Sequence, residues 1–182
     1  PELEAGWLTV GALRTGSDLN VMDELALYSN ACGNAKNWCL VAPGTIAVMI
    51  PSYEGDQLAY NHVAATGTSF AAPQVSAAAA LVWQAYPWMT NNQVRKTLLG
   101  TARDIGAPGV DELFGYGVLN TGKAVNGFGS LEWGTETFNV TAGSYDFSNA
   151  ITGSGGIIKD GVGTLFLSND NSFAGDVTVQ GG

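Results

Sequence analysis

Ser69 is the residue whose type and surroundings most readily suggest chemistry. It lies within the stretch ATGTSFAAPQVSAAAALVWQAYP, residues 65–87, between a Gly-Thr pair and an alanine-rich run. A nucleophilic serine needs an accessible hydroxyl, a base to accept its proton and donors for an oxyanion. The start of a helix supplies part of this, because free N–H groups and the positive end of the helix dipole face a reacting carbonyl. The alternative is a residue that only caps the helix.

The base is the missing part of this arrangement. His62 is the only histidine of the chain, and it precedes Ser69. In an α/β-hydrolase the acid and the histidine follow the nucleophile, so that class is excluded. The order acid, histidine, serine stays open, with the first two residues N-terminal to Pro1. No acid-containing motif surrounds His62, and we interpret it as a surface or substrate-cleft histidine.

Composition limits the class of protein. Of the 182 residues, 46% are hydrophobic and 13% are charged, which indicates a well-buried globular fold. The formal net charge is −9 with only 7 Lys and Arg residues, and this disfavours nucleic acid or an anionic membrane as a partner. No uninterrupted apolar run is long enough to predict a transmembrane helix. The first residues resemble neither the basic start nor the apolar core of a signal peptide.

The two cysteines, Cys32 and Cys39, could close a small disulfide loop or remain free thiols. Their spacing and the acidic, secreted-looking composition favour the disulfide, which would place folding in an oxidising compartment. A zinc site is disfavoured because no further Cys or His pair could complete four ligands. No cofactor or metal is expected. Asp104, Asp111 and Glu112 leave calcium open, but they form no recognisable calcium loop.

The elements that would position Ser69 begin with short strands. An apolar, partly β-branched run predicts a buried strand over residues 7–12. Residues 39–50 are predicted to form two short strands around a Pro-Gly turn. Residues 51–69 are predicted to be a polar loop with a short extended stretch that leads to the serine.

Two helices are predicted after these strands. The first runs from Ser69 to about Ala85, with Pro73 in its first turn, and its small and apolar side chains indicate burial on all sides. The second, TNNQVRKTLLGTA, is amphipathic and is capped by Thr90 or Asn91.

The pattern changes at about residue 126. Glycine, asparagine and serine then alternate with short apolar runs such as GIIK, GTLFLS and DVTVQ. Short strands and turns at a spacing of roughly ten residues suggest either a β-sandwich or the rungs of a β-helix. A solenoid that ended at Gly182 would expose a strand edge, so we expect the native chain to continue.

The stretch GTSFAAPQVSAAAAL resembles the serine motif Gly-Thr-Ser-x-Ala-x-Pro of the subtilisin-like proteases, or subtilases. Three further segments, LTVGAL, LVAPGTIAV and FGYGVLNTGKAV, resemble the core strand, the Ala-Pro-Gly segment and the closing Gly-x-Gly segment of that family. The resemblance implies an α/β fold with helices on a mainly parallel sheet. Residues 1–126 would be the C-terminal part of the catalytic domain.

A finer resemblance extends to the end of the chain. CGNAKNWCLVAPG and ITGSGGIIKDGVGTLFLSNDNSFAGDVTVQGG are similar to segments of subtilases of the autotransporter type from Gram-negative bacteria. The second segment resembles the glycine-rich repeat that begins the passenger β-helix in that family. Residues 127–182 are therefore expected to start a right-handed β-helix. The resemblance also implies passage through the periplasm, secretion or display on the outer membrane, and a translocator β-barrel downstream.

The resemblance implies roles for two residues. Ser69 matches the nucleophile, which attacks the scissile carbonyl of a protein or peptide and forms an acyl-enzyme, while its N–H donates to the oxyanion. Thr68 matches a position whose hydroxyl assists the oxyanion. The family's catalytic Asp and His and its oxyanion Asn would precede Pro1, so we expect residues 1–182 alone to be inactive and to need that N-terminal half for folding. The alternative function is a non-catalytic passenger scaffold or adhesin derived from a subtilase.

Overall fold

The computed structural model describes residues 6–14 and 24–182, which form two compact units. The serine unit consists of residues 9–75 and 104–117. The repeat unit consists of residues 6–8, 76–103 and 118–182. The division falls inside one long helix, between Val75 and Ser76.

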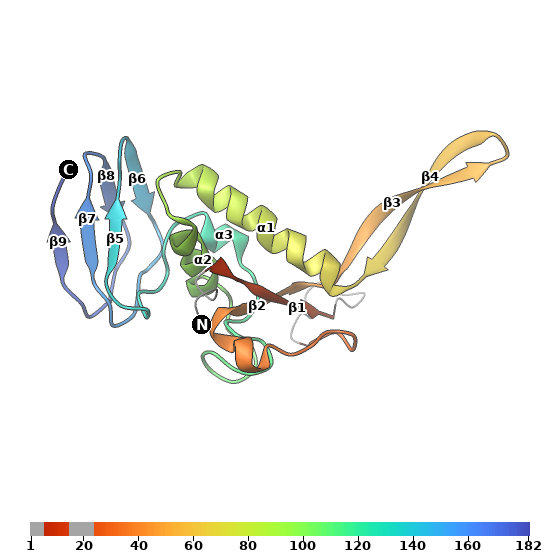
Figure 1. Ribbon diagram of the computed structural model, residues 1–182, viewed down its shortest axis with the longest axis horizontal. Coiled ribbons are helices and arrows are strands. Elements are labelled where there is room, and N and C mark those ends of the chain that lie inside the picture. The colour runs from red at the N-terminus through yellow and green to blue at the C-terminus, as the bar shows by residue number, and fades with distance from the viewer. Residues whose placement is uncertain (1–5, 15–23) are drawn as a thin grey trace. The chain divides into compact units, whose positions relative to one another are not determined.

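A parallel pair of buried strands forms the centre of the serine unit (Figure 1). Strand β1 (Thr9–Leu13) pairs with β2 (Cys39–Pro43) along its whole length. Ala12, Leu13 and Leu40 are fully buried. A near-continuous apolar run is typical of a parallel strand that is covered on both faces, and the strands predicted at these positions are confirmed.

A disulfide between Cys32 and Cys39 closes the loop in front of β2, as the spacing suggested. The two Cα atoms lie 5.8 Å apart, and the 3-10 helix η2 (Gly33–Trp38) occupies the loop. Neither cysteine is a free thiol.

The segment around Gly115 also bonds to β2. The N–H of Tyr116 donates to the Cys39 carbonyl, and the N–H of Val41 donates to the Gly117 carbonyl, both at 2.9 Å. Gly115 has a φ of 60°, and a Cβ at this position would collide with the Cys39 carbonyl. Only glycine permits this conformation and this close approach together.

Residues 45–66 form a long antiparallel hairpin, where the sequence predicted a short strand, a polar loop and a short extended stretch before the serine. Strand β3 (Thr45–Glu54) pairs with β4 (Gln57–Thr66) through all ten residues of each strand. The short strand and the extended stretch are parts of this hairpin, but the predicted polar loop was wrong, because Pro51 and the polar residues near Gly55 are typical of loops. In a two-stranded ribbon each strand is an edge strand, and an edge strand tolerates proline.

Helix α1 (Thr68–Ala85) follows β4 after one residue, Gly67. Its buried side chains are three or four residues apart and share one face: Ala71, Val75, Ala78 and Val82. Leu81 and Trp83 are each 45% exposed. The prediction of burial on all sides was therefore wrong, because an apolar composition does not determine how many sides of a helix are covered.

The second predicted helix is confirmed as α2 (Asn91–Gly100). Thr90 caps it: the Thr90 hydroxyl accepts a hydrogen bond from the Gln93 N–H at 3.2 Å, and Gln93 Oε1 accepts one from the Thr90 N–H at 2.9 Å. The one-turn helix α3 (Thr121–Ala124) follows later in the chain. No helix in the described part of the chain has the length and hydropathy needed to cross a bilayer.

Beyond residue 126 the chain forms short strands that pair in parallel (Figure 1). One sheet contains β5 (Glu136–Asn139), β7 (Ile157–Asp160) and β9 (Val177–Val179), and the other contains β6 (Ser144–Phe147) and β8 (Thr164–Leu167). Glu136 lies opposite Ile157, and Ile157 lies opposite Val177, so paired positions are 21 and 20 residues apart. Parallel pairing excludes the β-sandwich alternative, since the sheets of a sandwich are antiparallel.

An aromatic cluster forms the core of the repeat unit. Phe128, Phe138 and Phe147 are fully buried, and their ring centroids lie 4.9 to 5.9 Å apart. Tyr86 packs edge-on against Phe147 at 5.2 Å, and its hydroxyl donates to the backbone carbonyl of Asp146 at 2.7 Å. Burial, together with the nearby charge of Asp146, raises the pKa of Tyr86 to about 12.

Two largely buried lysines join strands of the repeat unit to other segments. Lys96 of α2 forms an ion pair with Glu136 of β5, and their side chains are 12% and 10% exposed. Lys159 of β7 donates to three backbone carbonyls at 2.8 to 2.9 Å, those of Asp160, Gly161 and Gly181. Strand β5, the first after residue 126, is thus bonded to α2 within one compact unit.

Candidate active site

Ser69 lies in the first turn of α1, directly after the hairpin. Strand β4 ends at Thr66, Gly67 connects the two elements, and Thr68 and Ser69 are the first two residues of the helix. The Ser69 side chain is exposed, and neither its hydroxyl nor its N–H has a hydrogen-bond partner among residues 6–14 and 24–182. The site therefore presents a free hydroxyl next to an unpaired N–H at the positive end of a helix.

The carbonyl of Gly44 holds the residue that precedes this helix. It accepts a hydrogen bond from the Gly67 N–H at 2.9 Å and another from the Tyr28 hydroxyl at 2.8 Å. A Cβ on Gly44 would collide with Tyr28 Oη and would lie 2.7 Å from the Ala12 Cβ, so no side chain fits here. The Pro-Gly turn of the sequence therefore fixes where α1 begins.

Gln74 ties the first turns of α1 to the end of β2. Its Nε2 atom donates to the carbonyls of Pro43 and Phe70, both at 2.7 Å. Pro73 was predicted in the first turn of the helix. It lies beyond that turn, inside the helix, because the helix already begins at Thr68. Proline has no N–H, so the Ser69 carbonyl lacks the donor that a residue four positions on usually supplies. The Gln74 side chain strengthens a turn that this missing bond weakens.

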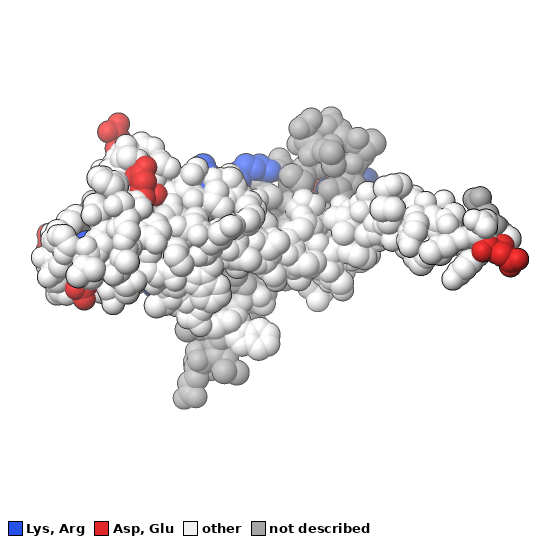
Figure 2. Space-filling view, turned by 90° about the horizontal axis from the view of Figure 1, so that it is seen from above, with Lys and Arg blue, Asp and Glu red and all other residues white. Residues whose placement is uncertain are grey.

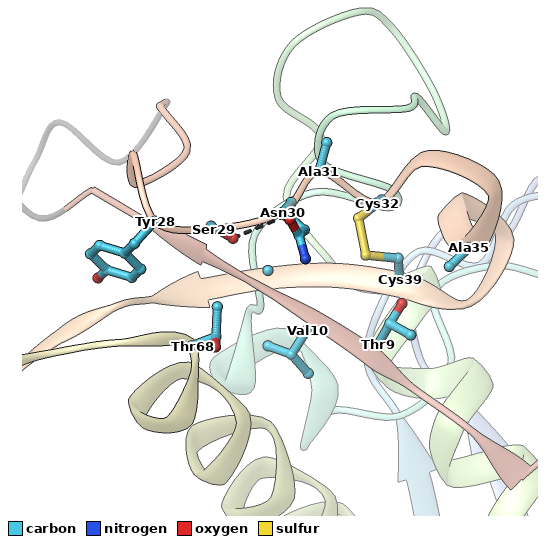
Figure 3. A pocket seen from close by; sticks show the side chains of 11 residues that line it. Thr9, Val10, Tyr28, Ser29, Asn30, Ala31, Cys32, Ala35, Cys39 and Thr68 are labelled. Atoms are coloured by element: carbon cyan, nitrogen blue, oxygen red, sulfur yellow. Dashed lines mark hydrogen bonds between the residues drawn. A yellow bond between two sulfur atoms is a disulfide. The ribbon is translucent and has the colours of Figure 1, made fainter.

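A pocket of about 410 Å³ opens beside Thr68 in the serine unit (Figure 3). Residues 9–11 of β1, residues 28–32, Ala35, Cys39 and Thr68 line it. The disulfide borders one side, and the Ser29 hydroxyl accepts a hydrogen bond from the Ala12 N–H at 2.9 Å. This volume lies within the usual range for pockets that bind small ligands, so it is large enough for a peptide side chain.

His62 lies too far along β4 to act as the base for Ser69. It is exposed and pairs with Met49 across the hairpin, four residues before the strand ends at Thr66. At about 3.3 Å per residue, its Cα is roughly 13 Å from that of Thr66. Helix α1 extends from the end of β4 in a different direction from the hairpin (Figure 1).

The three carboxylates considered as possible calcium ligands, those of Asp104, Asp111 and Glu112, bond to nearby protein groups. Asp104 and Asp111 accept hydrogen bonds from backbone N–H groups of the same loop at 2.7 to 2.9 Å. Glu112 pairs with Lys36 at 3.5 Å. Within the described residues, no group of three or more His, Cys, Asp and Glu side chains is arranged to hold a metal ion.

Comparison with protein families bears directly on the region around Ser69. The Subtilase family model matches residues 1–117, which is more than half of the chain. The chain belongs to the subtilase family. The model of the passenger-associated-transport-repeat matches residues 157–182 of this subtilase, so the resemblance to the autotransporter type is confirmed as well.

Relatives of this subtilase include secreted proteins. It is 45% identical over 163 residues to the Neisserial autotransporter lipoprotein NalP of Neisseria meningitidis, an alignment that covers 88% of the chain and 14% of NalP. It is 29% identical over 219 residues to the extracellular serine protease of Serratia marcescens, with coverage of 91% and 21%. These similarities place the subtilase among proteins that are secreted or displayed on the outer-membrane surface.

The crystal structure of fervidolysin from Fervidobacterium pennivorans, a keratinolytic enzyme related to subtilisin, supports the α/β fold. It matches with a TM-score of 0.52 and 30% identity, over 68% of this chain and 20% of that structure. The chain spans between 14% and 21% of the length of NalP, the Serratia protease and fervidolysin.

Two residues that position the start of α1 were not predicted from the sequence. Tyr28 and Gln74 lie outside the Gly-Thr-Ser-x-Ala-x-Pro positions, and each acts through a contact distant in sequence, with Gly44 and Pro43 respectively. The Ala-Pro-Gly segment was the available signal, since it marked the turn to which both residues bond.

Proposed function

We propose that this subtilase is the serine-bearing part of a secreted serine endopeptidase, with Ser69 as the nucleophile. One observation carries the proposal: the Ser69 hydroxyl is exposed and unpaired among the described residues, in the first turn of a long helix. A residue that only caps the helix would direct its hydroxyl to a backbone N–H of the first turn. Membership of the subtilase family supports the same role.

In this mechanism the Ser69 oxygen attacks the carbonyl carbon of the scissile peptide bond, and its proton passes to a histidine. The oxyanion accepts hydrogen bonds from the Ser69 N–H and, from slightly further away, the Thr68 hydroxyl. Collapse breaks the C–N bond and releases the amine, which takes the proton from the histidine. Water then hydrolyses the acyl-enzyme by the same steps and regenerates the serine.

The histidine and the aspartate that orients it are proposed to come from residues N-terminal to Pro1, together with the oxyanion asparagine. His62 does not fill this role, because its strand position is roughly 13 Å from the end of β4. Removal of triad members lowers the rate by several orders of magnitude. Residues 1–182 alone should therefore be close to inactive. The N-terminal half of the catalytic domain is the partner that this chain needs to complete the active site.

We also propose that residues 1–126 are the C-terminal part of the catalytic domain and that residues 127–182 begin a passenger β-helix. The parallel pairs β5–β7, β7–β9 and β6–β8 have spacings of 21, 20 and 20 residues, a regular period that suits a solenoid with one turn per repeat. A translocator β-barrel is expected downstream in the same protein.

A fluorophosphonate probe tests the role of Ser69 in the secreted protein. The wild type should be labelled, and mass spectrometry should place the adduct on Ser69. The Ser69→Ala variant should not be labelled, whereas Ser76→Ala, at an exposed serine two turns along the same helix, should react like the wild type. An unlabelled wild type would contradict the proposal and would favour the non-catalytic scaffold or adhesin.

A further inference from the structure

One face of the β3–β4 hairpin carries exposed apolar side chains. Met49, Tyr53, Leu58 and Tyr60 are between 52% and 76% exposed. Cross-strand pairs share a face, and Tyr53 pairs with Leu58 while Pro51 pairs with Tyr60. Met49 and Pro51 alternate with Tyr53 along β3, so they lie on the same side. We refer to Met49, Pro51, Tyr53, Leu58 and Tyr60 as the hairpin face.

The charge and the backbone of the hairpin restrict what can bind there. Residues 45–66 contain no Lys or Arg, and of their only acidic residues Glu54 ends β3 and Asp56 lies in the turn. Figure 2 shows acidic atoms at the tip of the hairpin and uncharged surface along the rest of its visible side. Within the described residues the hairpin is a two-stranded sheet, so the outer backbone edge of each strand is unpaired. These features suit an extended, mainly uncharged polypeptide.

The hairpin leads directly to the proposed nucleophile. Only Gly67 and Thr68 separate Thr66, the last residue of β4, from Ser69. Leu58 lies eight residues before Thr66, which corresponds to about 26 Å of strand. A polypeptide that is held at Ser69 and runs along the hairpin would therefore reach the far end of the hairpin face, at Leu58, within roughly eight residues.

We propose that the hairpin face binds an extended apolar segment of the polypeptide substrate, several residues away from the bond that Ser69 attacks. This inference rests on the proposed function and names its substrate class: proteins with apolar side chains at alternate positions several residues from the cleavage site. Addition of the substrate as a strand at a free edge would pair backbone groups of both chains. Every second side chain of the substrate would then contact the hairpin face.

A binding experiment that needs no turnover tests this inference. The Ser69→Ala form of the secreted protein is titrated into two fluorescent peptides that share one cleavage sequence and carry an extension of about eight residues. The extension has leucine at alternate positions in one peptide and serine in the other. Fluorescence anisotropy should show roughly tenfold tighter binding of the leucine peptide, because a few buried aromatic contacts dominate such interfaces.

Variants of the hairpin face provide the matched comparison. The double substitution Tyr53→Thr/Tyr60→Thr keeps residues that favour strands and should reduce the preference to about twofold or less. Phe166→Thr, at a strand residue of the repeat unit that is 55% exposed, should keep the preference. Equal affinities for the two peptides, or an unchanged preference in the double variant, would overturn the inference. The two peptides would also bind with equal affinity if a second copy of the chain or the N-terminal half of the domain covered the hairpin face, and the inference would then be overturned as well.

Hydrolysis separates a failure of this inference from a failure of the proposed function. The wild-type secreted protein is assayed with the two long peptides and with a short peptide that lacks the extension. The kcat/KM of the leucine peptide should exceed that of the serine peptide by about tenfold, and the double variant should lose most of this difference. No hydrolysis of any peptide would contradict the role of Ser69, while the anisotropy result would still decide whether the hairpin face binds.

Discussion

Replacement of Lys96 by methionine should destabilise the repeat unit by about 3 kcal/mol, because the Glu136 carboxylate would remain buried without its partner. The two side chains are only 12% and 10% exposed. Removal of one partner from a buried ion pair typically costs about 3–5 kcal/mol. The lower end applies here because the residual exposure lets water approach the carboxylate.

Two companion variants show whether the cost comes from the unpaired charge. Glu136→Gln should cost about 1–2 kcal/mol, since the long side chain of Lys96 can turn its ammonium group towards water. The double variant Lys96→Met/Glu136→Leu should lie within about 1 kcal/mol of the wild type, because apolar residues often replace a buried pair without loss. Lys96 Nζ also lies 5.8 Å from the centre of the Trp133 ring, a cation–π contact that both Lys96 variants lose.

Native-state hydrogen exchange of the secreted protein measures these effects locally. The free energy of opening is read from the amides of α2 and β5, the two elements that the ion pair connects. Lys123→Met, at an exposed lysine of α3, is the control and should change the opening free energy by less than about 0.5 kcal/mol. A loss below about 1 kcal/mol for Lys96→Met, or a double variant no more stable than that single variant, would refute the reasoning.

Two further predictions concern α1 and the aromatic core. Gln74→Leu should slow fluorophosphonate labelling of Ser69 about tenfold, because the carbonyls of Pro43 and Phe70 lose a donor and the first turns of α1 loosen. The control is Gln84→Leu, at an exposed residue of the same helix. A Gln74→Leu labelling rate equal to that of the control would contradict this prediction. Tyr86 has its pKa raised from 10.0 to about 12, so the stability it contributes is complete below pH 10 and is lost as the pH rises towards 12. Thermal unfolding in this range should therefore show a steeper fall for the wild type than for Tyr86→Phe, and parallel curves would contradict the assignment.

The fold could be predicted from the sequence wherever a signal was local. The GTSFAAP stretch placed Ser69 at the start of a helix, and Thr90, one of the two predicted caps, caps α2. Both signals depend on backbone groups within a few residues of each other, so the surrounding fold changes them little. The short spacing of the two cysteines belongs to the same class, and the disulfide was predicted correctly.

The hairpin shows why other features escaped prediction. Pro51 and the polar stretch around Gly55 favour a loop when they are considered alone, yet residues 45–66 form two strands of ten residues each. Pairing with the opposite strand supplies the hydrogen bonds that a single segment lacks. Strand formation is therefore decided by the partner, and the weak local pattern could not reveal the face that Tyr53 and Tyr60 share.

By itself the sequence determined the nucleophile candidate, the helix at whose start it lies and the family, because these depend on residue types at short, fixed spacings. Only the tertiary structure decided that the Gly44 carbonyl and the Gln74 side chain hold the start of α1. It also decided that the strands beyond residue 126 pair in parallel at spacings of 20 and 21 residues. These contacts join residues far apart in the chain, and their geometry depends on how the whole chain closes on itself rather than on any local preference.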